Sequence, residues 1–152
     1  MLAGVVRPKS RGRVYLSGPD PDDPVRIEAN LLSHPDDIKA ALVGVELCRE
    51  IGNSRALRSF ARREVMPGNL KGLELQNFIR NGAISYWHQS GTAAMGRDAM
   101  SVVDSELRVF GLTNLRIADA SIMPRVTTGN TMAACVVIGE RAAELLKIAH
   151  RI

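Results

Sequence analysis

A histidine near the middle of the chain is the first candidate for chemistry. His88 lies in the segment SYWHQSGTAAMG and is one of three histidines in the sequence. Imidazole is the side chain that exchanges a proton closest to neutral pH, which makes histidine the most frequent general base. A lone histidine after a strand is also often a structural residue that only forms hydrogen bonds. On residue type alone, both interpretations of His88 stay open.

Glycines follow this histidine at close spacing. Gly91 and Gly96 lack a Cβ atom, so the chain after His88 can pass close to a flat ligand. An ordinary glycine-rich turn accounts for the same residues equally well.

A second candidate site lies where a long apolar helix is predicted to begin. Gly129, Asn130 and Thr131 precede the apolar run MAACVVI. The first N–H groups of a helix have no partners within the helix and carry the positive end of its dipole. They therefore suit an anion or an electron-rich carbonyl group. Asn130 is explained equally well as a plain N-cap residue, whose side chain bonds the helix backbone.

Five short stretches are predicted strands that would position these residues. Val14 and Leu16 alternate with polar neighbours, and Val25 and Ile27 do the same after the turn-rich loop PDPDDP. This pattern predicts an antiparallel pair of strands. The five stretches are residues 11–18, 25–29, 83–88, 107–110 and 115–119. The third ends on His88 and the fifth on Asp119.

Three helices are predicted from apolar residues that recur at helical period. They span residues 34–51, 70–81 and 131–149. Ser33 and Asp36 have the spacing of a capping box at the start of the first helix. The last helix is apolar on nearly every face over residues 132–138, which is typical of a buried helix. Residues 120–130 are predicted to form a loop.

Length and composition exclude several classes of protein. The 152 residues are 45% hydrophobic and 24% charged, which suits one folded domain and excludes a disordered tail. No apolar run reaches the roughly 18 residues of a membrane span. No secretory signal opens the sequence, so a cytoplasmic location is predicted. Cys48 and Cys135 lack metal-site spacing, so no metal site is predicted and both are interpreted as small buried side chains.

The net charge of +4, from 20 Lys and Arg against 16 Asp and Glu, directs attention to nucleic-acid binding. The basic residues include two clusters, but the few aromatic residues supply no platform for stacking bases beside them. We interpret both clusters as solvated faces and predict no nucleic-acid partner. The clusters are Arg7, Lys9, Arg11 and Arg13, and Arg55, Arg58, Arg62 and Arg63.

Three segments, in this order and spacing, resemble the C-terminal region of the glucose-methanol-choline (GMC) oxidoreductases, a family of flavoproteins that oxidise alcohols. The segments are HQSGTAAMG, VVDSELRVFGLTNLRIADASIMP and GNTMAACVVIGERAAELL, and RPKSRGRVYL near the start also matches. The resemblance covers essentially the whole chain. The sequence departs from the family pattern at Gln89, where proline is frequent, and at Ala93, where cysteine is frequent.

The resemblance implies roles for individual residues. His88 matches the catalytic base that takes the hydroxyl proton of an alcohol as hydride leaves for FAD. Asn130 matches its partner, which orients the substrate oxygen. Asn130 and Thr131 would also face the flavin at the helix start, where the helix dipole favours negative charge. Asp119 and Ala120 match the segment that approaches the ribityl and pyrophosphate parts of FAD.

The predicted fold class is α+β. It comprises part of an antiparallel-sheet substrate domain with flanking helices over residues 1–100, and a C-terminal strand and helix over residues 101–152 that belong to the FAD-binding domain. The motif G-x-G-x-x-G, which binds the ADP part of FAD in this family, is absent. The expected partners are therefore a small alcohol substrate and the missing FAD-binding N-terminal region, or a chain supplying it. The alternative is a non-catalytic fragment or remnant that binds no cofactor alone.

Overall fold

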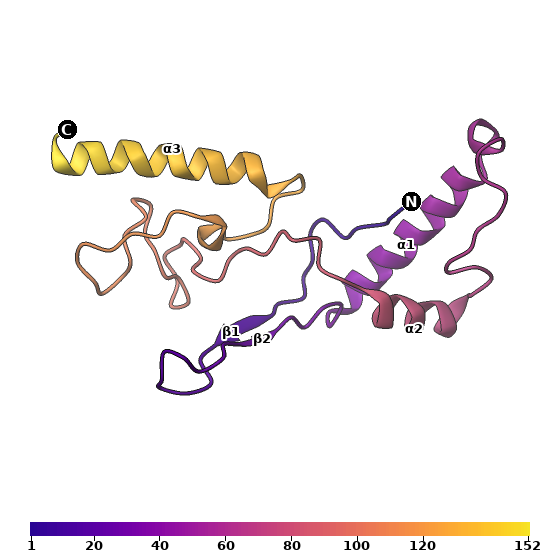
Figure 1. Cartoon of the computed structure of the whole chain (residues 1–152), viewed down its shortest axis with the longest axis horizontal. Helices are drawn as coiled ribbons and strands as arrows, with labels where there is room; N and C mark the ends of the chain where they lie inside the picture. Colours follow the sequence, from indigo (N-terminus) through magenta and orange to yellow (C-terminus); the bar gives the residue numbers. More distant parts are fainter. The chain divides into compact units, whose positions relative to one another are not determined.

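The computed structural model describes residues 1–152 and separates them into two compact units, Met1–Ile84 and Ser85–Ile152. Helices and a two-stranded antiparallel sheet are both present, which confirms the α+β fold class (Figure 1). The allocation of residues 1–100 and 101–152 to two domains of a larger enzyme stays a prediction.

The first unit begins with a short β-hairpin. Strand β1 (Arg13–Tyr15) pairs with β2 (Arg26–Glu28) in antiparallel register, with Val14 opposite Ile27. The predicted antiparallel pair is therefore confirmed, although each strand is shorter than predicted. Every residue of both strands is exposed, so no packed face extends the pairing.

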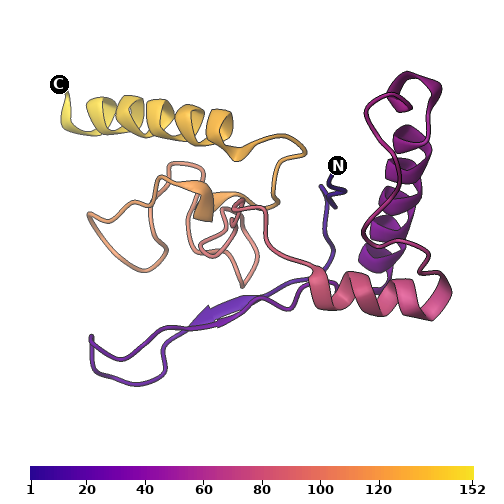
Figure 2. The same cartoon turned by 45° about the vertical axis from the view of Figure 1, so that its right-hand side comes forward.

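Two helices complete the first unit. Helix α1 (Pro35–Gly52) contacts helix α2 (Gly72–Gly82), and α2 lies at one end of α1 in two views (Figures 1 and 2). Both helices confirm the predictions from helical period. The connection between them contains η1 (Arg55–Leu57), a short 3-10 turn. Ile38 of α1 and Leu75 of α2 are buried aliphatic side chains in this unit.

The start of α1 differs from the prediction. Its N-cap residue is His34 rather than Ser33, and Nδ1 of His34 accepts a hydrogen bond from the N–H of Asp36 at 3.1 Å. Pro35 follows as the first residue of the helix. Proline is favoured at that position because its missing N–H would have no helical partner, and this places residue 34 at the cap.

A buried carboxylate connects the start of the chain to α1. The Asp37 side chain accepts hydrogen bonds from the backbone N–H groups of Lys9 and Ser10 and from the Ser10 hydroxyl. Asp37 is only 2% exposed. Burial acts to raise the pKa of Asp37, but these hydrogen bonds outweigh it, so the pKa lies below its ordinary value.

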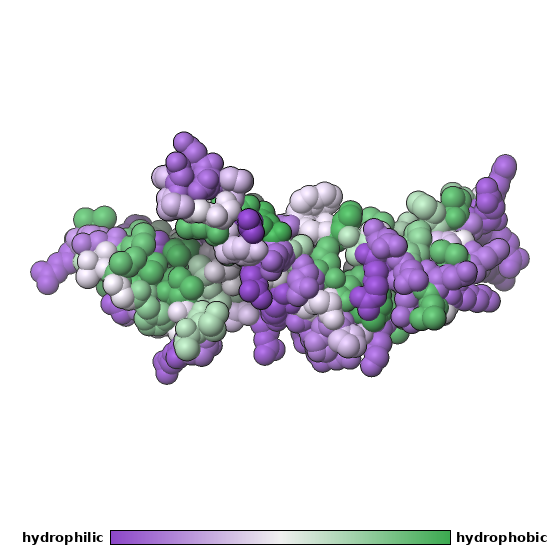
Figure 3. Space-filling view, turned by 90° about the horizontal axis from the view of Figure 1, so that it is seen from below, coloured by the Kyte–Doolittle hydropathy of each residue, from purple (hydrophilic) through white to green (hydrophobic).

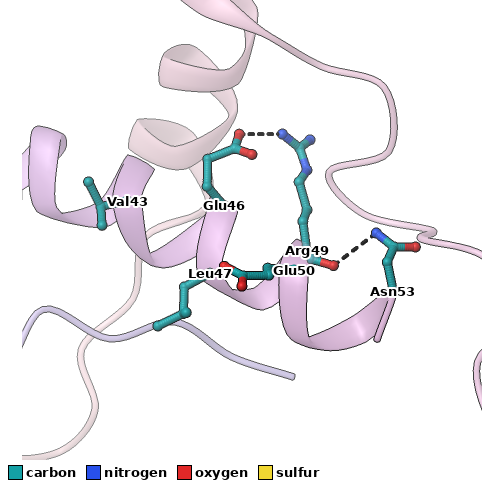
Figure 4. A pocket seen from close by; sticks show the side chains of 6 residues that line it. All are labelled: Val43, Glu46, Leu47, Arg49, Glu50 and Asn53. Carbon is teal, nitrogen blue, oxygen red and sulfur yellow. Dashed lines mark hydrogen bonds and ion pairs between the residues drawn. The ribbon is translucent and has the colours of Figure 1, made fainter. Parts of the chain in front are cut away.

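An arginine connects the other end of α1 to the loop that follows. The guanidinium group of Arg49 lies 2.7 Å from Glu46 and 3.1 Å from Glu64, and it donates to the carbonyls of Gly68 and Leu70. Its side chain is 16% exposed. Figure 4 shows the pair with Glu46 beside a surface hollow that is lined by α1 and the residue after it. Arg49 thereby stabilises the loop against the helix.

The second unit packs helix α3 (Thr131–His150) against an irregular segment, and both views show them side by side (Figures 1 and 2). The irregular segment includes η2 (Ala120–Ile122), a 3-10 turn within the predicted loop. Buried side chains from both parts form the core. They are Val103, Leu107, Ile122, Ala142 and Leu145. The helix predicted at the end of the chain is confirmed.

The strand predicted at residues 83–88 is wrong. These residues form no strand, and the backbone turns at Trp87, whose φ is 55°. An extended strand requires negative φ at each residue, so this turn interrupts it. His88 therefore lies on an irregular segment and not at the end of a strand.

The strands predicted at residues 107–110 and 115–119 are also wrong as continuous elements. They share one isolated antiparallel bridge, between Arg108 and Arg116. Leu107 has a φ of 65°, which turns the chain at the start of the first stretch. Leu107 itself is buried. The apolar pattern therefore identified a buried residue correctly, but it did not reflect a continuous strand.

Helix α3 is exposed along part of its length, which contradicts the prediction of a buried helix. Ala142 and Leu145 are buried, but Met132, Val136 and Val137 are 71%, 51% and 67% exposed. The irregular segment covers one face of α3, and these apolar side chains lie outside that contact. Hydrophobic residues also reach the surface elsewhere, as the face in Figure 3 shows.

The structure contains neither a membrane-spanning helix nor a cluster of metal-binding side chains. None of the three α-helices combines the length and the apolar character of a membrane span. No group of three or more His, Cys, Asp or Glu side chains is arranged to bind a metal ion. Cys48 and Cys135 are free thiols and are partly rather than fully buried.

Candidate active site

His88 and Asn130 meet although 42 positions separate them in the sequence. Nδ2 of the Asn130 side chain lies 3.3 Å from Nε2 of the His88 ring. His88 belongs to the irregular segment that opens the second unit, and Asn130 precedes the first turn of α3. The fold of one unit therefore brings the two predicted catalytic residues together.

The contact between the two side chains has a consequence for the imidazole. The amide nitrogen of asparagine is a donor only, so the contact is a hydrogen bond in the tautomer whose Nε2 lone pair accepts from Asn130. Neutral imidazole is the form that acts as a general base. A hydroxyl group at this position can donate to His88 while its oxygen accepts a hydrogen bond from Asn130.

Asn130 occupies the N-cap position of α3, but its side chain does not cap the helix. No hydrogen bond joins the side chain to the first turn, and that turn contains no acidic residue. The amide is directed to His88 instead, which argues against a plain N-cap role. The N–H groups at the start of α3 therefore have no side-chain partner and can bind an anion or an electron-rich carbonyl.

Backbone hydrogen bonds join the segment after His88 to η2. The donors are the N–H groups of Gly91, Ala93 and Met95, and the acceptors are the carbonyls of Ala120, Ser121 and Ile122, at 3.2, 2.9 and 2.8 Å respectively. Gly91 has a φ of 83°, and a Cβ atom there would lie 3.1 Å from the carbonyl oxygen of Met123. Glycine is therefore favoured at this position by both the positive φ and the close approach.

Asp119 and Ala120 lie at the start of η2. Oδ1 of Asp119 accepts the N–H of Ser121 at 2.7 Å and so caps the turn. Hydrogen bonds from the hydroxyl and the N–H of Ser121 lower the pKa of Asp119, and the opposing effect of burial is smaller. No hydrogen bond joins Asp119 or Ala120 to His88 or Asn130. The structure thus places these two residues on a neighbouring turn.

The residues that flank His88 have no functional role predicted from the sequence. The ring of Tyr86 stacks on the imidazole, with 5.5 Å between ring centroids and 16° between ring planes. Ser85 Oγ accepts the N–H of Trp87 at 3.0 Å and also a hydrogen bond from the Gln89 side chain. Trp87, which lies between Tyr86 and His88, has a left-handed backbone conformation, and no sequence pattern predicts it.

An imidazole beside an amide donor defines a class of site, one suited to taking a proton from a small polar substrate. A sequence profile described as GMC oxidoreductase matches residues 8–139. The chain belongs to the GMC oxidoreductase family, so the resemblance is confirmed.

Curated relatives match nearly the whole chain. An alcohol dehydrogenase (acceptor) of Pseudomonas putida is 42% identical over 141 residues, which are 91% of this chain and 26% of the relative. An oxygen-dependent choline dehydrogenase of Klebsiella pneumoniae is 42% identical over 146 residues, which are 95% of this chain and 26% of the relative. The chain therefore spans about a quarter of the length of these relatives.

Solved structures of similar proteins share the fold. The pyridoxine 4-oxidase from Mesorbium loti has a TM-score of 0.87 and 37% identity, over 91% of this chain and 28% of that chain. A FAD-dependent oxidoreductase from Chaetomium thermophilum has a TM-score of 0.86 and 31% identity, over 96% of this chain and 26% of that chain. FAD, the cofactor expected from the resemblance, is thus confirmed as a cofactor of the family.

Proposed function

We propose that this chain forms the proton-abstracting side of the active site in a FAD-dependent oxidoreductase that oxidises the CH–OH group of a small alcohol. The contact between His88 and Asn130 carries this proposal. It sets a base and a hydrogen-bond donor side by side, which is the arrangement that a hydroxyl group requires.

In this proposal His88 is the base. Its unprotonated Nε2 takes the proton of the substrate hydroxyl, and the O–H bond breaks as the N–H bond forms. Asn130 orients the substrate by donating to the same oxygen from Nδ2. Asparagine stays neutral at every pH, so it holds the oxygen in place but does not replace His88 as the base.

The residues present fit a flavin. The N–H groups at the start of α3 are free of side-chain caps and of acidic neighbours, so they suit the electron-rich edge of a ring. We assign that contact to Asn130 and Thr131, and the ribityl and pyrophosphate contacts to Asp119 and Ala120. When bound, FAD supplies the acceptor for the hydride that leaves the substrate carbon. The Asp119 carboxylate already accepts a hydrogen bond from the N–H of Ser121. The contacts of this turn to FAD would therefore come mainly from backbone groups.

The substrate class follows from the relatives. The curated proteins are named for alcohol and choline, and a solved relative is named for pyridoxine. Because this chain spans about a quarter of the curated relatives, we propose that the remaining contacts to FAD and substrate come from a region or chain outside residues 1–152.

The His88→Ala variant of the FAD-loaded protein tests this function. We expect flavin reduction by substrate to slow by about 100-fold or more, the contribution typical of a positioned base. The flavin content should stay the same. His150→Ala is the matched control, because His150 lies in the last turn of α3 and is exposed. Reduction at the unmodified rate in His88→Ala would remove His88 from the mechanism.

The alternative function is that of a non-catalytic remnant with no cofactor. The absorbance spectrum of the purified natural protein separates the two. A yellow protein with flavin bands supports the enzyme, and a colourless protein that also fails to take up added FAD supports the remnant.

A further inference from the structure

We propose that Tyr86 and the hydrogen bonds of Ser85 are positioning elements that hold the imidazole of His88 toward Asn130. The proposal rests on the proposed role of His88 as the base. Neither Tyr86 nor Ser85 would touch the reacting atoms, so both would act through the histidine.

The stacked ring is the first observation. The rings of Tyr86 and His88 lie nearly parallel, 16° apart, with centroids separated by 5.5 Å. Asn130 contacts the imidazole at Nε2 only. One hydrogen bond leaves a ring free to rotate about the donor–acceptor line, and a stacked partner removes that freedom because it fixes the plane.

The backbone between the two rings is the second observation. Trp87 separates Tyr86 from His88 and adopts a φ of 55°. A bulky residue seldom adopts this left-handed conformation, which is strained and persists only where neighbours stabilise it. Some local interaction must therefore support the turn.

Ser85 supplies that interaction. Its Oγ accepts the N–H of Trp87 at 3.0 Å and, from the other side of the histidine, the side-chain N–H of Gln89. One hydroxyl thus connects a residue before His88 to a residue after it. Ser85 is partly buried, whereas Tyr86 and Trp87 are 63% and 77% exposed, so packing around the aromatic rings does little to hold the turn.

The hydroxyl of Tyr86 forms no hydrogen bond, so only the ring should matter. Tyr86→Phe keeps the ring and Tyr86→Leu removes it, which makes them a matched pair. In the FAD-loaded protein, we expect Tyr86→Leu to slow flavin reduction by about 10- to 100-fold, the effect of a displaced catalytic group. Tyr86→Phe should reduce flavin at the unmodified rate. Since Tyr86 is exposed, neither variant should change the thermal midpoint or the flavin content.

A second measurement reports the ring position without activity. The ring protons of His88, observed by NMR in protein with labelled histidine, should lose the shift caused by the stacked ring in Tyr86→Leu and keep it in Tyr86→Phe. The signals of His34 and His150 are internal controls, because neither histidine stacks on Tyr86.

The serine is tested in the same way. Ser85→Ala should move the His88 signals and slow reduction, whereas Ser85→Thr, which keeps a hydroxyl, should restore both. Ser59→Ala is the control, since Ser59 is exposed and lies in the first unit.

The outcomes separate this proposal from the proposed function. If His88→Ala stops reduction while Tyr86→Leu and Ser85→Ala change neither the rate nor the His88 signals, the positioning proposal is overturned and the function stands. If His88→Ala leaves reduction unchanged, the function fails, and with it the catalytic part of this proposal. If the His88 NMR signals move in Tyr86→Leu while the rate of flavin reduction is unchanged, the stack orders the ring but does not serve catalysis. That result also overturns the positioning proposal.

Discussion

The Asn130 amide lies 3.3 Å from Nε2 of His88 and leaves the helix that it precedes uncapped. The usual role of asparagine at this position, a bond from its side chain to the helix backbone, is therefore not used. The side chain can serve the histidine instead, and stability and activity should respond differently to its removal.

We expect Asn130→Ala to affect the rate more than the stability. Because the side chain does not cap α3, the free energy of unfolding should change by no more than about 0.5 kcal/mol, as for an ordinary surface substitution. Flavin reduction should slow by about 10-fold, which is less than in His88→Ala, because an orienting donor is lost but the base remains. Urea unfolding and stopped-flow absorbance of the FAD-loaded variant measure the two effects.

His34→Ala is the opposite case and serves as the control. His34 does cap its helix through Nδ1, so its loss should cost about 1 kcal/mol of stability and leave flavin reduction unchanged. An Asn130 variant that loses stability alone would return Asn130 to the role of a cap.

The helices were predictable because their signal is local. Apolar residues three and four positions apart define a face whatever the rest of the chain does, and α1 and α3 begin and end close to their predicted bounds. The hairpin was predictable for a similar reason, since β1 and β2 are joined by one turn-rich loop. The stretches around Leu107 and Ile117 had the right apolar pattern, but continuous strand pairing depends on partners that the pattern does not specify.

The site was only partly predictable. Residue types made His88 and Asn130 reasonable candidates, and the family resemblance was needed to pair them. The stack of Tyr86 on His88 accompanies a positive φ at Trp87. A tryptophan does not predict this conformation, because most residues that adopt it are glycine or asparagine. The sequence therefore predicted which side chains could react. It did not predict the backbone conformation that orients them.

The buried Asp37 should stabilise the first unit. Asp37→Asn keeps the shape but replaces one of the two acceptor oxygens by an NH2 group, which cannot accept from the N–H group of Lys9 or Ser10 that it faces. Leaving buried donors unpaired costs about 1–3 kcal/mol, so we expect a loss of that size at neutral pH by urea unfolding. Asp22→Asn, at an exposed loop position, is the control and should change nothing. Equal stability of Asp37→Asn and the unmodified chain would contradict the role.

Acid should weaken the same contact. The pKa of Asp37 is lower in the folded chain than its ordinary value, because hydrogen bonds to the carboxylate outweigh burial. The ionised group therefore stabilises the fold fully above its unfolded pKa of about 3.9, and this stabilisation is lost as the pH falls through the folded pKa. Unfolding experiments below about pH 4 should show a shallower loss of stability in Asp37→Asn. Asp104 and Asp119 also have lowered pKa values, so part of the acid sensitivity should remain.

Arg49 should control the order of the loop after α1. Arg49→Ala removes bonds to Glu64 and to the carbonyls of Gly68 and Leu70, so the loop should open more often. Trypsin should then cleave this loop severalfold faster. Mass spectrometry of the fragments over time measures the cleavage rate. Arg49→Lys should rescue it only in part, since an ammonium group cannot reproduce the fork of the guanidinium. Arg141→Ala removes an exposed pair with Glu144 and should leave the cleavage rate of this loop unchanged.

The exposed apolar side of α3 leads to the last prediction. Met132, Val136 and Val137 are 71%, 51% and 67% exposed, and soluble monomers seldom expose large continuous apolar patches. We expect residues 1–152 expressed alone to aggregate or to require a partner, and to bind no FAD, as measured by size exclusion with absorbance read at flavin wavelengths. Val137→Glu should raise the monomeric fraction, whereas Ala143→Glu, at another exposed position of α3, should not. A well-behaved yellow monomer would contradict the prediction, because it would show that these residues bind the cofactor and stay soluble without any further covering surface.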